Sequence, residues 1–403
     1  MIDRRIYDVI IVGGGMAGAT LAGVLARAGL GVLALEKEPK FRDRIRGEGT
    51  WPWGVAEAFR LDLGELLRLA GCVEFEGLQS YEQRQPAKRF VLPADSIDGL
   101  CEIGYFHPRF QEAAFTWAAA QGATMARPAK VAAFTHDGRP TATVVYDGRE
   151  ERVSARLVVA ADGKLSMARR WTGGETVADP EHHRFGGVLL TGVRTDDRQF
   201  DNVASLDREG INWFAAGADA TRLYLLMTAA RVRETGVDRS LAAIVAYAAP
   251  LMPEGALDEA EQIGPIGYFP NNDIWASRIA GNDVALIGDA AGSPDPSVGH
   301  GTPLVFRDVR ELSELLLSER DWRAAIAEYA ARRERYFGVI REYDRWRCII
   351  EHEPGPDADR LREGHQRAEQ RDPTLGGFAF IEGRGPDGLV ADEAARRMYF
   401  DEN

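Results

Sequence analysis

Residues 7–18 read YDVIIVGGGMAG, and this stretch decides the fold. A mainly apolar run typical of a buried strand leads directly into glycines at positions 13, 15 and 18, which form a GxGxxG arrangement. Gly13 allows a tight turn, Gly15 lets a pyrophosphate approach the backbone, and Gly18 lets the following helix pack closely on the strand. The stretch therefore predicts a strand, a turn and a helix that bind a dinucleotide.

The next residues extend this unit. Residues 16–28 are rich in alanine and leucine and fit a helix, whose first turn, with Ala17, offers unpaired N–H groups and a positive dipole end to the phosphates. Residues 31–35 (GVLAL) predict a second buried strand, and Glu36 follows it. An acidic residue about 20 residues after the glycines accepts hydrogen bonds from an adenosine ribose, so we expect Glu36 to hold the ribose.

Two later stretches repeat the pattern of strand, acid and loop. Residues 157–161 (LVVAA) predict a central parallel strand, with Asp162 and Gly163 at its carboxyl edge, where α/β folds bind ligands. Residues 283–287 (DVALI) lead to Asp289, an irregular loop and a long helix, and the carboxylate of Asp289 can hold a polyol hydroxyl. The residues expected beside the flavin ring are Gly299, Gly301 and Thr302 at the start of that helix. The three stretches in this order predict one FAD-binding site.

Residues 41–53 (FRDRIRGEGTWPW) are rich in arginine, glycine and tryptophan, which is loop composition. Arginines after the ribose-binding strand can reach a pyrophosphate, and the candidates are Arg44 and Arg46. The alternative is a basic turn that is only solvated.

The expected fold class is α/β. It combines a Rossmann-like FAD-binding domain of the glutathione-reductase type, an interleaved, mainly β substrate domain, and C-terminal helices. The FAD-binding domain is expected at residues 1–80, 105–178 and 280–320, and the substrate domain at 81–104 and 179–279. Residues 321–403 are expected to form a helical segment and a tail, which serves as a surface-wrapping lid or an oligomer contact.

Composition narrows the class of protein. The 403 residues exceed one typical domain, and a hydrophobic content of 45% is ample for a large core. The first strand begins by residue 7 and no apolar run approaches the length of a membrane span, so we expect a cytoplasmic protein without a signal peptide. A net charge of −13 disfavours nucleic acid and anionic membranes as partners. The three scattered cysteines suggest neither a disulfide framework nor a metal site, and a monomer or homodimer is expected.

With these motifs in place, residues 5–345 resemble the flavoprotein monooxygenases of the para-hydroxybenzoate hydroxylase type. The resemblance implies that FAD is reduced by NADH or NADPH, that O₂ adds to give a flavin C4a-hydroperoxide, and that one oxygen atom is transferred to an aromatic or conjugated small molecule. Bound FAD carries the difficult chemistry, and the protein positions the reactants and excludes water.

The same resemblance gives roles to individual residues. It assigns the ADP half of FAD to the first glycine motif and Glu36, and it places a main-chain contact to adenine at Val131. Residues 44–47 match the family's arginine loop. The sequence departs from the family at His107, where an arginine that contacts the pyrophosphate is usual, unless Arg109 replaces it. A second departure is Gly292, where the family more often has histidine.

His300 is the sharpest catalytic candidate. It stands in the loop expected beside the flavin ring, and its unperturbed pKa of about 6.5 suits proton exchange near neutrality. The alternative is a histidine that only hydrogen-bonds the loop backbone. Pro296 is expected to shape the substrate side of that loop. The aromatic residues that could line a substrate pocket, or instead belong to the core, are Trp53, Tyr105, Trp213 and Phe214.

Other functions remain open. Residues 46–52 (RGEGTWP) resemble the glycine-glutamate loop of flavin-dependent halogenases and of geranylgeranyl reductases. A halogenase should also carry a WxWxIP motif, which is missing, and a tunnel lysine, for which Lys88 is the one candidate and is expected to be solvated. An FAD-dependent reductase of an isoprenoid or other double bond is a further alternative, as is a non-catalytic redox sensor.

Overall fold

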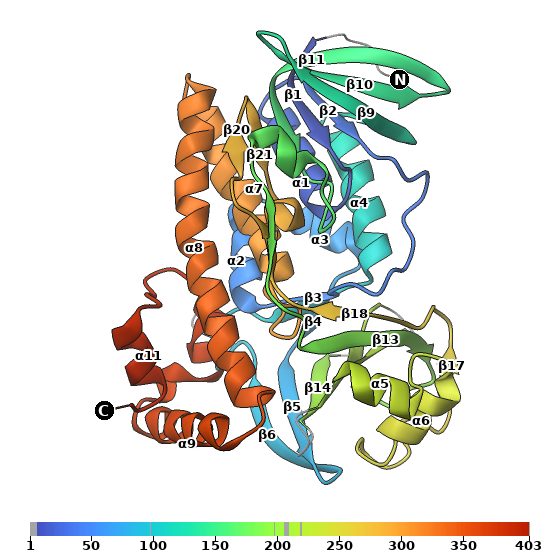
Figure 1. The fold of residues 1–403 in the computed structure, drawn as a ribbon. Coiled ribbons are helices and arrows are strands. Elements are labelled where there is room, and N and C mark those ends of the chain that lie inside the picture. The colour runs from blue at the N-terminus through green and yellow to red at the C-terminus, as the bar shows by residue number, and fades with distance from the viewer. Residues whose placement is uncertain (1–5, 97, 197, 205–208, 218–219, 403) are drawn as a thin grey trace.

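The computed structural model describes residues 6–96, 98–196, 198–204, 209–217 and 220–402 (Figure 1). The outer domain limits expected at residues 1 and 403 lie outside these ranges. The chain forms an α/β fold with a Rossmann-like first sheet, a mainly antiparallel second sheet and C-terminal helices. The predicted fold class is therefore confirmed.

The first sheet has a parallel centre. Its strands lie in the order β20, β21, β11, β1, β2 and β8, and β10 and β9 extend antiparallel from β11. Strands β21, β11, β1, β2 and β8 run parallel. The strand bounds are β1 Ile6–Val12, β2 Val32–Leu35, β8 Thr124–Ala126, β9 Ala129–His136, β10 Pro140–Tyr146, β11 Arg149–Ala160, β20 Ala280–Gly281 and β21 Val284–Leu286.

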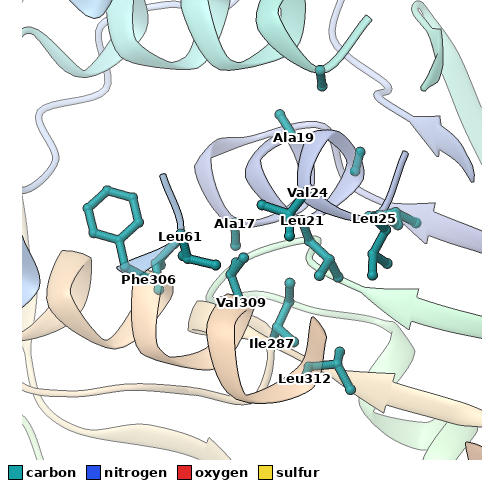
Figure 2. Close-up of a cluster of buried hydrophobic side chains, with 14 of the residues drawn as sticks. Ala17, Ala19, Leu21, Val24, Leu25, Leu61, Ile287, Phe306, Val309 and Leu312 are labelled. Atoms are coloured by element: carbon teal, nitrogen blue, oxygen red, sulfur yellow. The ribbon is translucent and has the colours of Figure 1, made fainter. Parts of the chain in front are cut away.

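Successive side chains of β1 point to opposite faces of the first sheet and so belong to two different cores. Val9 and Ile11 belong to the core shared with the helices, whereas Ile10 and Val12 belong to the core on the opposite face. Figure 2 shows Leu21 of α1 and Val309 of α7 within the first of these cores. The helices on this side are α1 Met16–Arg27, α2 Pro52–Arg60, α3 Gly64–Ala70, α4 His107–Ala120 and α7 Gly301–Ser318, together with the start of α8 (Trp322–Glu351). The starts of α1 and α7 are thereby held near the carboxyl edge of the sheet.

The second sheet has two different faces. One face packs on α5 (Ala229–Thr235) and α6 (Leu241–Ala248) through residues such as Ile211 and Leu223, and the other carries an aromatic cluster. Its strands are β5 Gly77–Glu82, β6 Gln85–Val91, β13 His183–Thr191, β14 Gln199–Ala204, β15 Gly210–Ala215, β16 Thr221–Met227, β17 Glu261–Gln262 and β18 Gly267–Asn271. This sheet therefore has one face free to form the wall of a site.

Two small sheets and the C-terminal helices join these parts. The small sheets contain β3 Gly49–Thr50, β4 Val73–Phe75 and β7 Glu102–Gly104, and β12 Thr176–Ala178, β19 Ile274–Ala276 and β22 Gly292–Ser293. In Figure 1, α8 (Trp322–Glu351) runs from the first sheet down toward the second, where α9 (Pro356–Arg371) and α11 (Glu393–Tyr399) lie. The short helices are η1 Ala168–Thr172, η2 Gly288–Ala290, η3 Pro373–Leu375, η4 Gly377–Ala379 and α10 Ile381–Arg384. Within the described ranges, no helix combines the length and apolar composition needed to cross a membrane.

Candidate active site

The three sequence motifs meet at one edge of the first sheet. Val12 at the end of β1 is in register with Ala160 of β11, and Ala160 is in register with Leu286 of β21. The glycine turn, the Asp-Gly turn and the Gly-Asp loop therefore leave the sheet side by side. Segments more than 250 residues apart in sequence form one site because parallel strands bring their carboxyl ends together.

Glycine is required in the first turn for steric reasons. Gly13 has a φ of +102°, and a Cβ built there would lie 2.3 Å from the carbonyl oxygen of Ala161. A Cβ at Gly18 would lie 1.9 Å from the carbonyl oxygen of Gly13, so α1 packs directly on the turn. No side chain caps the start of α1 at Gly15, which leaves its first N–H groups available to an anion.

A single cavity of about 1810 Å³ begins at these turns and extends to the free face of the second sheet and to the C-terminal helices. Pockets for one ligand usually measure about 300–1,000 Å³, so this cavity has room for a dinucleotide cofactor and a further molecule. The predicted site residues that line it are Gly13, Gly15, Ala17, Glu36, Arg44, Arg46, Val131, Asp162, Gly163, Phe214, Asp289, Pro296, Gly299, Gly301 and Thr302.

The carboxylates of Glu36 and Asp162 lie at the carboxyl edge of the sheet, where they can accept hydrogen bonds from the hydroxyl groups of a dinucleotide. The carboxylate of Glu36 accepts hydrogen bonds from the N–H groups of Gly14 and Glu38, both at 2.8 Å, which fixes its orientation at the end of β2. Oδ2 of Asp162 accepts from Met167 N at 3.1 Å, whereas its buried Oδ1 has no hydrogen-bond partner among the described residues. An orphaned acceptor beside uncapped helix N–H groups fits a bound cofactor that supplies hydroxyl donors.

Several positively charged side chains act on the carboxylate of Asp289. Burial raises the pKa of Asp289, and Arg46 and Lys164 partly offset this by attraction to the carboxylate. Arg169 donates to the carbonyl oxygens of Asp289 and Ala290, both at 2.9 Å, and so holds the backbone of this loop. Lys164 and Arg169 were not identified from sequence, since neither stands within a recognised motif.

The departure at His107 has a structural explanation. His107 Nδ1 lies 3.1 Å from the carbonyl oxygen of Gly47, and its backbone N–H donates to Glu48. Burial lowers the pKa of His107 to about 4, so the ring is neutral and positions the arginine loop. Arg109 is exposed, does not line the cavity, and lies against Gly71.

Gln111 lies beside the first glycine turn, which Arg109 does not reach. It follows His107 by one helical turn on α4 and lines the cavity. Its Nε2 lies 3.3 Å from the position that a Cβ on Gly15 would take. The spacing of four residues from His107 was the signal that could have identified it, because residues i and i+4 share a helix face.

The structure does not place His300 at the cavity wall. The ring is fully buried, its Nδ1 accepts from Trp53 Nε1 at 3.3 Å, and its Nε2 lies 3.5 Å from Asp344 of α8. Burial lowers the pKa of His300 to about 3 and raises that of Asp344, so both groups are neutral rather than an ion pair. His300 therefore packs the start of α7 against α8 and lies outside the cavity lining, contrary to the expectation of a catalytic group beside the flavin ring.

Three of the four aromatic candidates belong to the core. Trp53 and Tyr105 are buried beside α7, and the hydroxyl of Tyr105 lies 2.6 Å from Thr302 Oγ1. Trp213 faces α5 and α6, whereas the next residue, Phe214, faces the cavity. Adjacent residues of a strand point to opposite faces, so Trp213 and Phe214 cannot both line one pocket.

The loop that carries Pro296 is held firmly beside the cavity. Trp51 Nε1 donates to the carbonyl oxygen of Val298 at 2.7 Å, and Asp295 Oδ2 lies 2.6 Å from His182 Nε2. Burial raises the pKa of Asp295, but hydrogen bonds from His182 and Ser297 more than offset this and bring it below its usual value. Asp295 and His182 therefore form an ion pair behind the loop.

The same part of the fold holds the one group of possible metal ligands found among the described residues, His182, Asp295 and Cys348. Burial raises the pKa of the Cys348 thiol, which disfavours the thiolate that a metal would need.

C-terminal residues close the cavity from the side opposite the first sheet. The Phe378 ring packs edge to face on Trp51 and on Phe90, with centroids 5.7 Å and 5.3 Å apart. Lys88 lies at the same rim, 59% exposed, with Nζ 3.3 Å from Glu369 of α9. Lys88 is thus largely solvated, although it also contributes to the cavity lining.

A family model described as FAD binding domain matches residues 6–336. The chain belongs to this family. Family membership makes FAD the cofactor and the protein a flavin-dependent oxidoreductase, in agreement with the three motifs. The resemblance to flavoprotein monooxygenases that the sequence suggested is likewise confirmed.

Curated relatives of this family member span more than one activity. Squalene epoxidase erg1 of Aspergillus fumigatus is 26% identical over 78% of this chain and 67% of that protein. Digeranylgeranylglycerophospholipid reductase 2 of Methanococcoides burtonii is 26% identical over 73% of this chain and 71% of that protein. The chain spans 54% to 67% of the length of the first three squalene enzymes that it matches.

Solved structures share this fold over most of the chain. The flavin-dependent brominase Bmp2 aligns with a TM-score of 0.75, 20% identity and 98% coverage of both chains. PqsL of Pseudomonas aeruginosa, described as a probable FAD-dependent monooxygenase, aligns with a TM-score of 0.70 and 20% identity over 81% of this chain and 92% of that chain.

Proposed function

We propose that the protein is an FAD-dependent monooxygenase that uses NADH or NADPH and O₂ to insert one oxygen atom into an aromatic or conjugated small molecule. The observation that carries the proposal is the continuity of the cavity, which joins the dinucleotide motifs to an aromatic wall under a C-terminal cover. In that wall Phe200 and Phe214 stack at 5.0 Å, and Phe185 lies 4.8 Å from Tyr224. Such a wall suits a flat, apolar substrate.

The cofactor residues have distinct roles in this proposal. The first turn of α1 binds the pyrophosphate together with Gln111, Glu36 binds the adenosine ribose, and the backbone at Val131 contacts adenine. Asp162 and Asp289 accept hydrogen bonds from cofactor hydroxyls. The remaining predicted contacts are Arg44 and Arg46 beside the nucleotide and Gly299, Gly301 and Thr302 beside the flavin ring.

Bound FAD supplies electron transfer from the nicotinamide cofactor to O₂ and the activation of that O₂. The protein's part is to orient the substrate and to keep water away from it. Pro296 shapes the substrate side of the loop, which Trp51 and the pair of His182 and Asp295 hold in place. Phe378 closes the cavity next to Trp51.

Two observations favour halogenation as the second candidate. The brominase Bmp2 aligns over nearly the whole chain, C-terminal helices included, and Lys88 contributes to the cavity lining. The exposure of Lys88 and its contact with Glu369 weigh against a role as a tunnel lysine. Because one relative is a reductase, reduction of a double bond is the third function to be tested.

One screen separates these functions. The FAD-loaded protein is incubated with aromatic and conjugated compounds, NADH or NADPH, ¹⁸O₂ and bromide or chloride, and products are analysed by mass spectrometry. Oxygen transfer gives an ¹⁸O-labelled product. A halide-dependent product without ¹⁸O identifies a halogenase, and a reduced product formed without O₂ identifies a reductase. NAD(P)H oxidation with no product from any compound would count against all three.

The cofactor assignment has its own test. Asp289→Asn should weaken FAD binding by about 10-fold or more, because a hydrogen bond to a charged group contributes about 1.5–3 kcal/mol. The matched control is Asp137→Asn in an exposed turn, which should bind FAD like the unmodified protein. Equal FAD affinity in the two variants would remove Asp289 from the site.

A further inference from the structure

A row of polar side chains crosses the aromatic wall of the cavity. In the second sheet, Asn202 of β14 is in register with Ser80 of β5 on one side and with Asn212 of β15 on the other. All three residues line the cavity. We call Ser80, Asn202 and Asn212 the polar row.

Apolar residues flank the polar row. Two positions along each strand, on the same face, Leu78, Phe200 and Phe214 are in register with one another. These three also line the cavity, and the rings of Phe200 and Phe214 stack. A ligand lying on this face would thus contact apolar surface and reach the polar row with one edge.

The side chains of the polar row have no hydrogen-bond partner in the part of the chain that the structure describes. None of the three forms a side-chain hydrogen bond or ion pair with another described residue, although each is half-buried. Polar residues on the opposite face differ, since Asp201 accepts from Gln199 at 2.6 Å and from Thr195 at 2.9 Å. The polar row therefore keeps its donors and acceptors available to whatever occupies the cavity.

The chemistry of the row is neutral. A carboxamide offers two N–H donors and a carbonyl acceptor, and a hydroxyl offers one donor and two lone pairs. Two charged residues near the row also line the cavity, and both are engaged elsewhere. Glu209 accepts from Arg231 at 3.0 Å and from the hydroxyl of Tyr247, and Lys88 of the adjoining β6 lies 3.3 Å from Glu369. Uncharged carbonyl, amide or hydroxyl groups complement such a row better than ions do.

The row also leads toward the cofactor part of the cavity. Asn212 is in register with Tyr224 of β16, and the Tyr224 hydroxyl donates to the carbonyl oxygen of Arg46. Arg46 stands in the loop whose charge acts on Asp289. A ligand group bound by the polar row would therefore lie near the strand that contacts the arginine loop.

We propose that the polar row recognises a neutral oxygen- or nitrogen-bearing group on an aromatic or conjugated substrate, so that the protein selects such compounds over hydrocarbons of the same shape. This inference rests on the proposed function, in that it specifies the substrate class of the same cavity. A hydrocarbon would cover the three side chains without replacing their hydrogen bonds to water, and buried polar groups left unpaired oppose binding.

The test measures equilibrium binding to the oxidised, FAD-loaded protein, with neither NAD(P)H nor a turnover step. The probes are two sets, each with the same two-ring framework: naphthalene, 2-naphthol and 2-quinolinone, and biphenyl, 4-phenylphenol and biphenyl-4-carboxamide. Binding is followed by the change in the absorption spectrum of the bound flavin. We expect a polar member of at least one set to bind about 10-fold or more tightly than its hydrocarbon.

Variants then assign that preference to the row. Asn202→Leu and Asn212→Leu should reduce the preference to about threefold or less and leave hydrocarbon binding equal or tighter. Phe200→Leu in the flanking row is the matched control, because it should change the affinities for both kinds of compound by similar factors. Retained FAD and an unchanged unfolding temperature show that each variant is folded, and Ser80→Ala provides a milder variant of the same row.

Three results would overturn the inference: hydrocarbons that bind as tightly as their polar partners in every set, no binding of any polar probe, or a preference that persists in both asparagine variants. The proposed function can fail separately. If the preference and its loss are observed while no compound yields an ¹⁸O-labelled product, the polar row still recognises the ligand and the reaction assignment is wrong.

Discussion

Arg222 and Glu48 form a buried ion pair, with Nε of Arg222 2.7 Å from Oε2 of Glu48. Arg222 also reaches Asp43 at 2.9 Å, and Glu48 accepts from the backbone N–H of His107. The pair connects β16 of the second sheet to the arginine loop and thus to both parts of the cavity. Glu48 belongs to the loop of residues 46–52, which resembles a loop of flavin-dependent halogenases and geranylgeranyl reductases. In this structure its ion pair with Arg222 holds the loop in place.

Removing one partner of this ion pair should lower the free energy of unfolding. Arg222→Leu leaves the Glu48 carboxyl buried without its counter-charge, so we expect a loss of about 3–5 kcal/mol in the free energy of unfolding, measured by urea denaturation. The double variant Arg222→Leu/Glu48→Leu should recover part of this loss. Arg194→Leu, which breaks the exposed pair with Asp258, is the control and should change stability by about 0–1 kcal/mol. Similar losses in the two single variants would contradict a structural role for the buried pair.

The steric requirement at Gly13 makes a second prediction. Gly13→Ala forces a Cβ against the Ala161 carbonyl and places alanine at a positive φ, so it should destabilise the protein by more than about 1 kcal/mol and weaken FAD binding. Thermal unfolding and flavin retention on gel filtration measure the two effects. Gly64→Ala at the start of α3, where a Cβ meets no atom within 4 Å, should be neutral or stabilising. A fully flavinated, stable Gly13→Ala protein would refute this account of the turn.

His300 should affect stability in acid rather than turnover. Because its pKa is about 3 when folded and about 6.5 when unfolded, the unfolded chain binds more protons between these values. The stabilisation is complete above pH 6.5 and is lost as pH falls toward 3, with a slope of up to about 1.4 kcal/mol per pH unit. His300→Gln should flatten this dependence in chemical denaturation series and leave the pH profile of turnover unchanged. A shifted pH profile of turnover in this variant would show that His300 takes part in the reaction.

Phe378 should keep solvent away from the cavity. Phe378→Ala removes the ring that packs on Trp51 and Phe90 and should cost about 3–5 kcal/mol locally, so the C-terminal cover loosens. We expect stronger quenching of flavin fluorescence by iodide and more H₂O₂ released per NAD(P)H consumed. Val390→Ala, at a side chain that is 62% exposed, is the control and should change neither quantity. Unaltered quenching in Phe378→Ala would mean that the cover does not shield the flavin.

The cofactor side of the site could be predicted well from sequence because its requirements are local. The turn at Gly13 needs a positive φ and no Cβ, and Glu36 needs to end the second strand, so both leave a short-range pattern. Gln111 and Lys164 were not predicted, because Gln111 lies on α4 outside the motifs and Lys164 follows Asp162-Gly163 without being one of the residues that the motif requires. Their positions depend on how α4 and the Asp-Gly turn pack.

The substrate side could not be predicted in the same way. The sequence alone cannot say which face of β15 is free, and therefore whether Trp213 or Phe214 reaches the cavity. His300 stands among glycines in a loop typical of a flavin site, yet Asp344 of α8 and Trp53 of α2 enclose it. The C-terminal segment carried no motif at all, and it supplies Phe378 to the cavity wall.

The sequence by itself determined the cofactor class, the α/β fold and the order of the three motifs, because backbone turns and strand ends impose strict residue requirements over a few positions. Only the tertiary structure decided which side chains share the cavity. Strand register aligns Ser80, Asn202 and Asn212, and long-range packing buries His300 and brings Phe378 to Trp51. These relationships join segments far apart in the chain, so no local pattern encodes them.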